Sequence, residues 1–366
     1  MKNVLGLLNL QEDNALIHEL ANDRPVEMIP FGGRYRLIDF ALSNMVNSGI
    51  RTVGIMLPEN SRPVLDHVRS GKDWDLARHH EGLSFLPARL NERRFAGDLK
   101  DYYDQLDFIE HDPSEYILLS GGNFVCKLDY NILQDVQAAT QADIVVIYGK
   151  TETDGHNGVV LKLDEEGLVK EISYRQDVKK DRNLYLGVCF LKRRLFAEVV
   201  RSSYESGNYD FLFDVLARRL HKLRVAAVEH QGYAREINST ASYYQASMDL
   251  LNVSVFNELF RRGHIISTKA KDRSPVRYQD SAVVKNSLIA NGCNIAGEVE
   301  NSILFREVTV ERGAKIKNCI VMQNGMIKEN AILENVICDK NVVISQEKWL
   351  KGVQEYPLIV NKNIVI

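Results

Sequence analysis

The chain has 366 residues, of which 45% are hydrophobic and 26% charged, and its net charge is −3. This length and composition suit a soluble protein of two domains, and the small net charge predicts neither a nucleic-acid nor a membrane partner. The five cysteines show no C-x-x-C spacing, and the sequence has neither an apolar run of 18 residues nor a signal-peptide pattern, so we expect reduced thiols in the cytoplasm.

The first 150 residues alternate between patterns typical of strands and of helices. Apolar runs predict buried strands at residues 4–10, 51–57, 116–120 and 143–148. Amphipathic stretches predict helices at residues 37–45, 61–70, 97–110 and 131–142, with a further helix at 242–251. Alternation of this kind predicts a parallel α/β sheet with right-handed crossovers.

Residues 30–50 combine a glycine turn with basic side chains. Gly32 and Gly33 precede Arg34 and Arg36, and a predicted helix follows directly. Arg51 comes just after that helix ends. Because a helix start attracts anions, this basic group is a candidate anion site, and a set of solvated surface arginines is the alternative.

From about residue 281 the sequence repeats itself. The tripeptides NSL, NSI, NCI and NVI begin at Asn286, Asn301, Asn318 and Asn335, in steps of 15, 17 and 17 residues. Apolar residues recur about six apart, and we expect them to stack inward as columns: Val283, Ile289, Ile295, Val310, Ile316. Three short strands per coil, with Asn and Gly at the corners, predict a left-handed parallel β-helix.

Several strings resemble one family. PFGGRYRLIDFALSN and NSGI in residues 30–50 closely resemble the N-terminal region of glucose-1-phosphate adenylyltransferases, which make ADP-glucose for glycogen. KLDY at residues 127–130 and the hexapeptide coils also match that family. The resemblance implies a Rossmann-like nucleotidyltransferase domain at 1–251, a connector at 252–280 and a left-handed β-helix domain at 281–366.

The family's phosphate-binding residues are replaced here. Its turn GG-x-G-T-R-L falls on residues 11–17, where Leu16 takes the place of the arginine and no glycine remains. Glu12 and Asp13 add negative charge at the same place. The lysine of the family's R-A-K-P falls on Val26.

The family's metal and sugar residues are altered too. The Mg²⁺ aspartate that follows the glycine of G-D-H falls on Asn123 in GNFVCKLDY, and the second metal aspartate falls on Glu236 in GYAREINS. The sugar-phosphate lysine is replaced by Arg175, and the sugar-binding serine by Tyr185. Mg²⁺ prefers charged oxygen ligands in strict geometry, so we expect no functional metal site and no cofactor, with Mg²⁺ needed only if activity is retained.

A preserved scaffold around an altered site is typical of the family's D-type regulatory subunits, which assemble with a catalytic C-type subunit into a tetramer. The resemblance implies a cytoplasmic, catalytically poor subunit that modulates ADP-glucose synthesis in such a hetero-oligomer, although a homo-oligomer when alone stays open. It also implies a phosphate or sugar-phosphate effector at Arg34, Arg36 and Arg51, with Arg34 the best candidate.

Two alternatives remain open. The first is an active glucose-1-phosphate adenylyltransferase that makes ADP-glucose from ATP and glucose 1-phosphate. The second, more remote one is a hexapeptide acyltransferase. Those acyltransferases generally present a histidine base from the β-helix, and the histidines of this chain end at His264, before the coils.

Overall fold

The computed structural model describes residues 1, 3–10, 15–78, 81–87, 97–151 and 156–366. The described chain divides into two compact units. The first unit contains residues 1–12 and 40–234, and the second contains residues 13–39 and 235–366. The second unit therefore joins an N-terminal segment to the C-terminal third of the chain.

A nine-stranded sheet is the centre of the first unit. Its strands are β1 (Val4–Asn9), β4 (Thr52–Leu57), β5 (Gly82–Pro87), β6 (Tyr116–Gly121), β8 (Ile144–Lys150), β9 (His156–Leu163), β10 (Val169–Val178), β11 (Asn183–Lys192) and β12 (Val225–His230). The short strand β7 (Phe124–Cys126) follows β6. The predicted strands at 4–10, 51–57, 116–120 and 143–148 correspond to β1, β4, β6 and β8.

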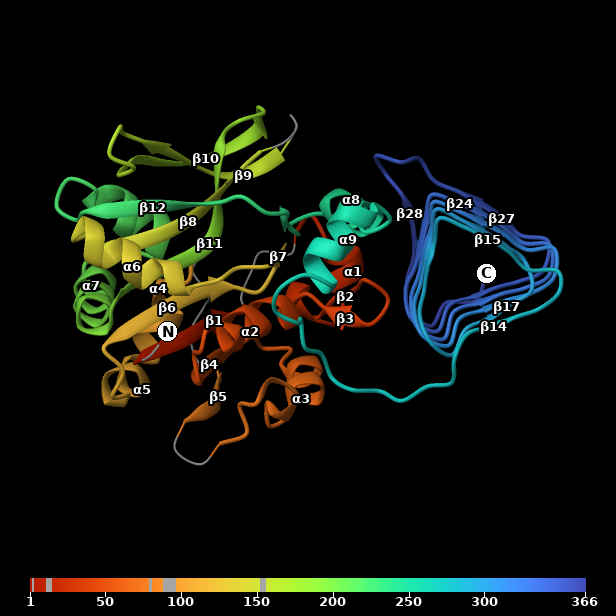
Figure 1. Cartoon of the computed structure of the whole chain (residues 1–366), viewed down its shortest axis with the longest axis horizontal. Helices are drawn as coiled ribbons and strands as arrows, with labels where there is room; N and C mark the ends of the chain where they lie inside the picture. Colours follow the sequence, from red (N-terminus) through yellow and green to blue (C-terminus); the bar gives the residue numbers. More distant parts are fainter. Residues whose placement is uncertain (2, 11–14, 79–80, 88–96, 152–155) are drawn as a thin grey trace. The chain divides into compact units, whose positions relative to one another are not determined.

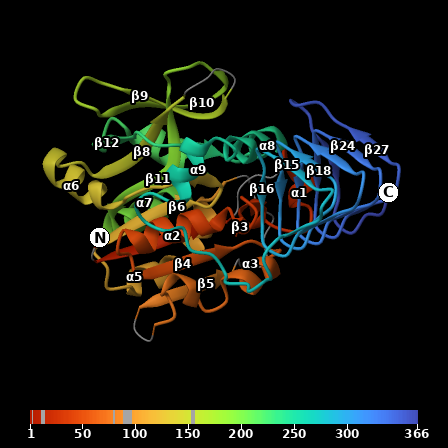
Figure 2. The same cartoon turned by 45° about the vertical axis from the view of Figure 1, so that its right-hand side comes forward.

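The sheet is mixed, and the expectation of a parallel sheet was wrong for two strands, β10 and β11. The pairs β1–β4, β1–β6, β4–β5 and β8–β12 are parallel. Strand β11, however, runs antiparallel to both β6 and β8. The physical reason is the connection. Strand β11 follows the antiparallel pair β9–β10, which Figures 1 and 2 show projecting from the rest of the sheet, and residues 179–182 between β10 and β11 contain no crossover helix.

Helices complete the first unit. They are α2 (Ile38–Asn47), which begins in the second unit, α3 (Arg62–Val68), α4 (Leu99–Asp104), α5 (Leu106–His111), α6 (Asn131–Thr140) and α7 (Arg193–Glu205), with the shorter turns η2 (Lys72–Trp74), η3 (Phe211–Leu216) and η4 (Ala217–Arg219). The helix predicted at 97–110 is interrupted at Gln105, where α4 ends and α5 begins. Apolar side chains of the strands pack with α7 residues such as Phe196 and Val200 in one core.

Outside the coils, the described part of the second unit contains short strands, one 3₁₀ turn and the helices α1, α8 and α9. These are α1 (His18–Ala21), η1 (Val26–Met28), β2 (Pro30–Phe31), β3 (Tyr35–Arg36), β13 (Ala234–Glu236), which starts at the end of the first unit, α8 (Thr240–Asp249) and α9 (Val253–Phe260). The stretch at 252–280, expected as a connector, therefore contains a helix. Asn252 starts α9 by accepting a hydrogen bond from the Ser254 backbone N–H at 3.0 Å.

The C-terminal coils form the predicted left-handed parallel β-helix. Its strands are β14 (Arg277–Tyr278), β15 (Val283–Lys285), β16 (Leu288–Ile289), β17 (Asn294–Ile295), β18 (Glu298–Glu300), β19 (Ile303–Leu304), β20 (Thr309–Val310), β21 (Lys315–Lys317), β22 (Ile320–Val321), β23 (Met326–Ile327), β24 (Ile332–Glu334), β25 (Val336–Cys338), β26 (Val343–Ile344), β27 (Trp349–Lys351) and β28 (Leu358–Val360). They pair in three five-stranded sheets, which form the three sides of the triangular coil in Figure 1.

The repeated asparagines occupy the corners, as the sequence predicts. Asn286, Asn301, Asn318 and Asn335 have φ angles of 40°, 47°, 52° and 53°, a left-handed conformation that asparagine tolerates. Their side chains also bond from coil to coil, for example Asn318 Nδ2 to Asn335 Oδ1 at 3.2 Å. These bonds satisfy amide groups that would otherwise be unpaired at each corner.

One residue of the predicted inward column was wrong. Val283 is 46% exposed and lies in register with Glu298, which places it on the outer face. Its neighbour Val284 pairs with the buried Val299 and packs against the interior. The first coil is thus shifted by one residue from the six-residue spacing, and in a strand such a shift reverses the side-chain direction.

Candidate functional site

The carboxyl ends of β1 and β6 lie side by side, with Asn9 in register with Gly121. Asn123 follows two residues later and is only 2% exposed. Among the residues that the structure describes, the Oδ1 atoms of Asn9 and Asn123 are both buried without a hydrogen-bond partner. This edge of the central strands thus holds amide oxygens that could accept hydrogen bonds but carry no charge.

Asn123 does not fit a magnesium site. A neutral amide oxygen is a weak substitute for the carboxylate that Mg²⁺ prefers. Glu236 lies half-buried in β13 of the second unit. The described residues contain no group of three or more His, Cys, Asp or Glu side chains that could hold a metal ion.

The other altered family positions lie in varied surroundings. Leu16 is 64% exposed, whereas Val26 is 2% exposed within η1. On β10, Arg175 forms an exposed ion pair with Glu171, with an N–O distance of 3.4 Å. Tyr185 is half-buried on β11.

Glu12 and Asp13 lie outside the described residues, as do the other positions at 11–14. The assignment of all these residues to a degenerate catalytic site stays a prediction.

The glycine turn shapes a basic hairpin in the second unit. Strands β2 and β3 pair antiparallel across Gly32 and Gly33, whose φ angles are 56° and 80°. The turn leaves Arg34 exposed, with its guanidinium carbon 5.0 Å from the centre of the Tyr35 ring. Arg36 is half-buried and donates a hydrogen bond from Nη1 to the Met28 carbonyl at 2.6 Å. The turn thus fixes both arginines on one short, rigid element.

A basic column runs along one corner of the β-helix. Backbone hydrogen bonds from Asn324, Asn341 and Asn363 to the carbonyls of Arg306, Gln323 and Lys340 align successive coils. The aligned positions, here called the corner column, are Arg306, Gln323, Lys340 and Lys362.

The segment that carries the hairpin runs along the corner column. Arg24 forms a buried ion pair with Asp339, which directly precedes Lys340, and Asp23 pairs with Lys362 at 3.6 Å. A Cβ on Gly33 would lie 3.9 Å from the Leu304 carbonyl oxygen. The hairpin and the corner column therefore lie together within the second unit.

Cations accumulate where hairpin and column meet. We call this group the cation cluster: Arg34, Arg36, Lys271, Arg306 and Lys340. Arg306 is only 8% exposed, and among the described residues its guanidinium has no ion pair or hydrogen bond. A buried cation without a partner is costly, so its position here favours an anionic ligand.

The pKa values reflect this crowding of positive charge. Burial lowers the pKa of Arg306, and the neighbouring Arg34 and Arg273 lower it further. Lys271 is exposed, but partial desolvation still lowers its pKa, and Arg306 and Arg36 lower it further. Asp39 and Glu307 act in the opposite sense on Arg306. The cluster is therefore electrostatically strained as long as no anion balances it.

Sequence reasoning identified only the hairpin half of this cluster. Lys271, Arg306 and Lys340 were missed because they lie far from Arg34 in the sequence. A signal was present, since Arg306, Gln323 and Lys340 recur every 17 residues, at the period of the asparagine corners. Basic residues at one fixed position of a repeat form a column on the folded coil.

Arg51 belongs to the first unit, unlike Arg34 and Arg36. It is half-buried, and its Nη1 donates a hydrogen bond to the Val46 carbonyl at 3.2 Å. This contact closes the end of α2. The part of Arg51 in anion binding stays a prediction.

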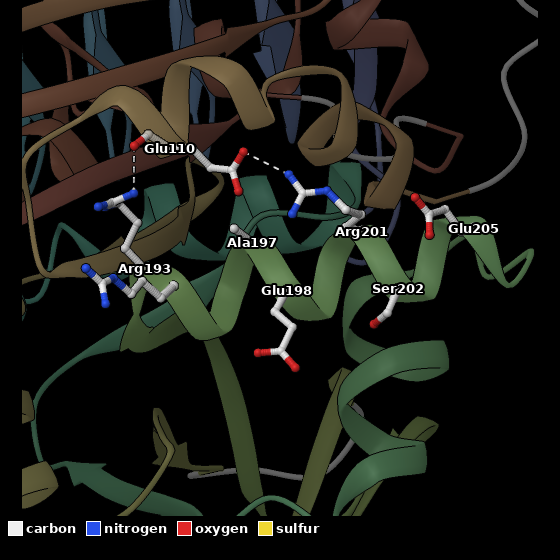
Figure 3. A pocket seen from close by; sticks show the side chains of 8 residues that line it. Glu110, Arg193, Ala197, Glu198, Arg201, Ser202 and Glu205 are labelled. Carbon is white, nitrogen blue, oxygen red and sulfur yellow. Dashed lines mark hydrogen bonds and ion pairs between the residues drawn. The ribbon is translucent and has the colours of Figure 1, made fainter.

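A separate hollow of about 510 Å³ lies between α5 and α7 (Figure 3). Its lining carries charges of both signs, which largely compensate one another: Arg201 pairs with Glu110 at 2.8 Å. Arg193 donates to the carbonyls of Ser114 and Ile109 and so closes the end of α5. Balanced, internally bonded charge of this kind makes the hollow a weaker candidate than the cation cluster.

Two whole-chain expectations can be compared with the structure. All five cysteines are free and buried, as expected for thiols that form no disulfide. Within the described residues, the helices are too short or too polar to span a bilayer.

Comparisons with known proteins place the chain in a family. Residues 17–253 match the nucleotidyl transferase family, and residues 274–353 match the GlmU-like C-terminal hexapeptide family. The glycogen biosynthesis protein GlgD of Bacillus subtilis is 32% identical over 99% of this chain and 96% of its own length. GlgD of Geobacillus stearothermophilus is 33% identical over 99% of this chain and 97% of its own.

The relatives also include proteins named as enzymes. The glucose-1-phosphate adenylyltransferase of Clostridium perfringens strain 13 is 30% identical over 92% of this chain and 88% of its own length. Matches of this length and identity over both units establish the relationship. The chain belongs to the nucleotidyl transferases and, within them, to the family of glucose-1-phosphate adenylyltransferases and GlgD glycogen biosynthesis proteins.

Proposed function

We propose that this chain is a regulatory, catalytically poor subunit that modulates ADP-glucose synthesis for glycogen through a catalytic C-type glucose-1-phosphate adenylyltransferase. The observation that carries the proposal is Asn123. At the carboxyl end of the central strands, a buried neutral amide stands where resemblance places the metal-binding carboxylate. Without that charge, the main electrostatic stabilisation of nucleotidyl transfer is lost, while the folded scaffold is retained.

A subunit without chemistry can still change a rate by linkage. If this chain binds the active conformation of its partner more tightly than the inactive one, it shifts the partner's population toward activity. The effect is bounded by the difference in affinity, which is typically about 1–3 kcal/mol, or roughly 5–150-fold. We further propose a heterotetramer of both subunit types in the cytoplasm.

The test is an ADP-glucose synthesis assay on this chain alone, on the C-type subunit alone and on their mixture, with size-exclusion chromatography of the same samples. We expect negligible turnover by this chain, co-elution with the partner, and a raised rate or altered effector response in the mixture. Substantial turnover by the purified chain would instead favour an active adenylyltransferase. Separate elution with unchanged kinetics would contradict the regulatory role.

We also propose that the cation cluster binds the effector, a phosphate or a sugar phosphate. The cluster offers arginine guanidinium groups, which match phosphate oxygens in geometry and charge. Its buried Arg306, which has no ion pair among the described residues, supports this assignment most directly. This site joins residues of the hairpin and of the coils, and both lie in the second unit.

Substitution of Arg34 by alanine tests the effector site. Because Arg34 is exposed, we expect the variant to fold and assemble while the effector response of the mixed assembly weakens at least several-fold. Arg62→Ala is the matched control, because its side chain is 90% exposed and its one ion pair among the described residues is with Asp66 on α3. An equal effector response in both variants would show that Arg34 does not contribute to effector binding.

A further inference from the structure

Lys340 is the member of the cation cluster with the most unusual surroundings. It is half-buried in the corner column, and its Nζ has no ion pair or hydrogen bond within the described part of the chain. Arg24 and Arg36 act on it from the N-terminal segment, and Lys362 acts on it from the next coil. Within the described residues, the acid that acts on it is Asp339, which already pairs with Arg24.

These surroundings disfavour a charged ammonium. Burial lowers the pKa of Lys340 to about 7, and Arg36 and Arg24 contribute to the shift, whereas Asp339 opposes it. An ordinary lysine has a pKa of about 10.4. The free protein therefore holds Lys340 close to half-protonated at neutral pH. An anion that enters the cluster offsets part of the local positive charge and favours the ammonium form of Lys340.

We propose that Lys340 couples anion binding at the cation cluster to the uptake of one proton, so that the affinity of the site for a phosphate-like dianion falls as the pH rises above neutrality. This inference rests on the effector site proposed above and adds its regulation. It makes Lys340 a binding residue that loses its charge in the free protein and regains it with the ligand.

The sign of the effect follows from the two states. Below neutral pH, Lys340 is charged with or without the anion, so affinity is highest and changes little with pH. Above neutral pH, the free protein has lost the proton, and binding must take it up again from solution. By linkage, affinity then falls toward tenfold per pH unit until the pH reaches the higher pKa of the bound state.

Sulfate is the probe of choice, because it stays a dianion throughout the neutral range. Calorimetric titration of the full chain at pH 6 and at pH 8 should show about a tenfold weaker affinity at pH 8, as expected for a pKa near neutrality. Repeating the titration at pH 8 in two buffers of different ionisation enthalpy should show uptake of about one proton per sulfate.

Lys340→Gln should bind sulfate more weakly at pH 6 and lose most of this pH dependence. Lys317→Gln is the matched control, because Lys317 lies on the exposed face of β21 and pairs with Glu300 at 3.7 Å. We expect the control to behave as the parent chain. Equal pH dependence in Lys340→Gln and in the parent chain would overturn the inference while leaving the effector site in place.

A second measurement does not depend on anion binding. The rate at which an amine-reactive reagent labels Lys340, followed by peptide mass spectrometry, should rise with a midpoint near pH 7. Sulfate should move that midpoint upward. A midpoint near the ordinary value of about 10 would overturn the proton coupling alone. A midpoint near neutrality that sulfate does not move, with no sulfate heat at any pH, would overturn the effector site and the coupling with it.

Discussion

Asn123 shows how one residue can remove chemistry and keep a fold. Its side chain is 2% exposed, and its Oδ1 is buried without a partner among the described residues. Asn123→Asp would restore the carboxylate of the family but would place a charge in a buried position without a counter-ion. We expect this variant to lose roughly 1–3 kcal/mol of unfolding free energy and to gain no ADP-glucose synthesis, because residues 11–17 still lack the glycine turn.

Urea denaturation and the synthesis assay measure the two outcomes of that substitution. Asn123→Ser, which is small and neutral, serves as the control for the effect of charge. Calorimetric titration with ATP, with and without Mg²⁺, completes the test on the parent chain. A Mg²⁺-dependent affinity in the micromolar range would contradict a spoiled metal site.

Among single residues, the sequence predicted the hairpin members of the cation cluster but not those of the coils. Arg34 and Arg36 follow two glycines, and that local signal suffices for a tight basic turn. Arg306 and Lys340 join them only because the coils stack and bring a fixed position of each repeat onto one corner. Burial creates their electrostatic strain, and no local pattern of the sequence reports how deeply one arginine is buried.

Among the elements, the asparagine corners allow a stringent test. Asn335 has a φ of 53°, accepts a hydrogen bond from Asn318 and donates one to the Gly352 carbonyl at 3.2 Å. Asn335→Ala should lower the unfolding free energy by about 2–4 kcal/mol, because it loses both bonds and strains the backbone. Asn335→Gly should lose less, since glycine accepts this φ without strain.

Asn286→Ala is the matched control for the corner test. Asn286 has a φ of 40° as well, so alanine strains the backbone there too, but Asn286 is exposed and among the described residues its side chain bonds only to Asn301. We therefore expect a smaller loss of about 1–2 kcal/mol. Thermal unfolding of the three variants ranks these effects. Equal losses of unfolding free energy in all three variants would show that the side-chain hydrogen bonds of the corner asparagines do not stabilise the coils.

The elements also show where pattern reasoning reaches its limit. The coil period was predicted from four recurring tripeptides, because each repeat makes the same corner. The inward column was misplaced at Val283, where the first coil departs from the six-residue spacing. The direction of β11 was missed because periodicity reports which faces are buried and says nothing of whether neighbouring strands run parallel.

At the scale of the whole molecule, the second unit is built from segments that lie far apart in the sequence, and this predicts how the chain responds to cleavage. Residues 15–39 and 235–251 pack with the coils, through Arg24 with Asp339 and through the Tyr244 hydroxyl, which donates to the Asn318 carbonyl at 2.7 Å. The predicted boundary after residue 251 therefore leaves the coils joined to the earlier segments by side-chain contacts. Deleting the coils would remove the partners of Arg24 and Tyr244 and leave these side chains unpaired, which could destabilise the remaining chain. Loss of function in such a truncation would therefore not by itself identify a docking surface.

Limited proteolysis tests this coupling without deletion. Residues 270–275 are exposed and contain Lys271 and Arg273, where trypsin can cut. We expect the two fragments to elute together in native buffer and to separate only in denaturant. Asp339→Ala should weaken their association, because it leaves the buried Arg24 without its carboxylate, a change that typically costs about 3–5 kcal/mol. Glu300→Ala, which breaks only an exposed pair with Lys317, should leave the fragments together, whereas separation of the parent fragments would show that the connector alone holds them.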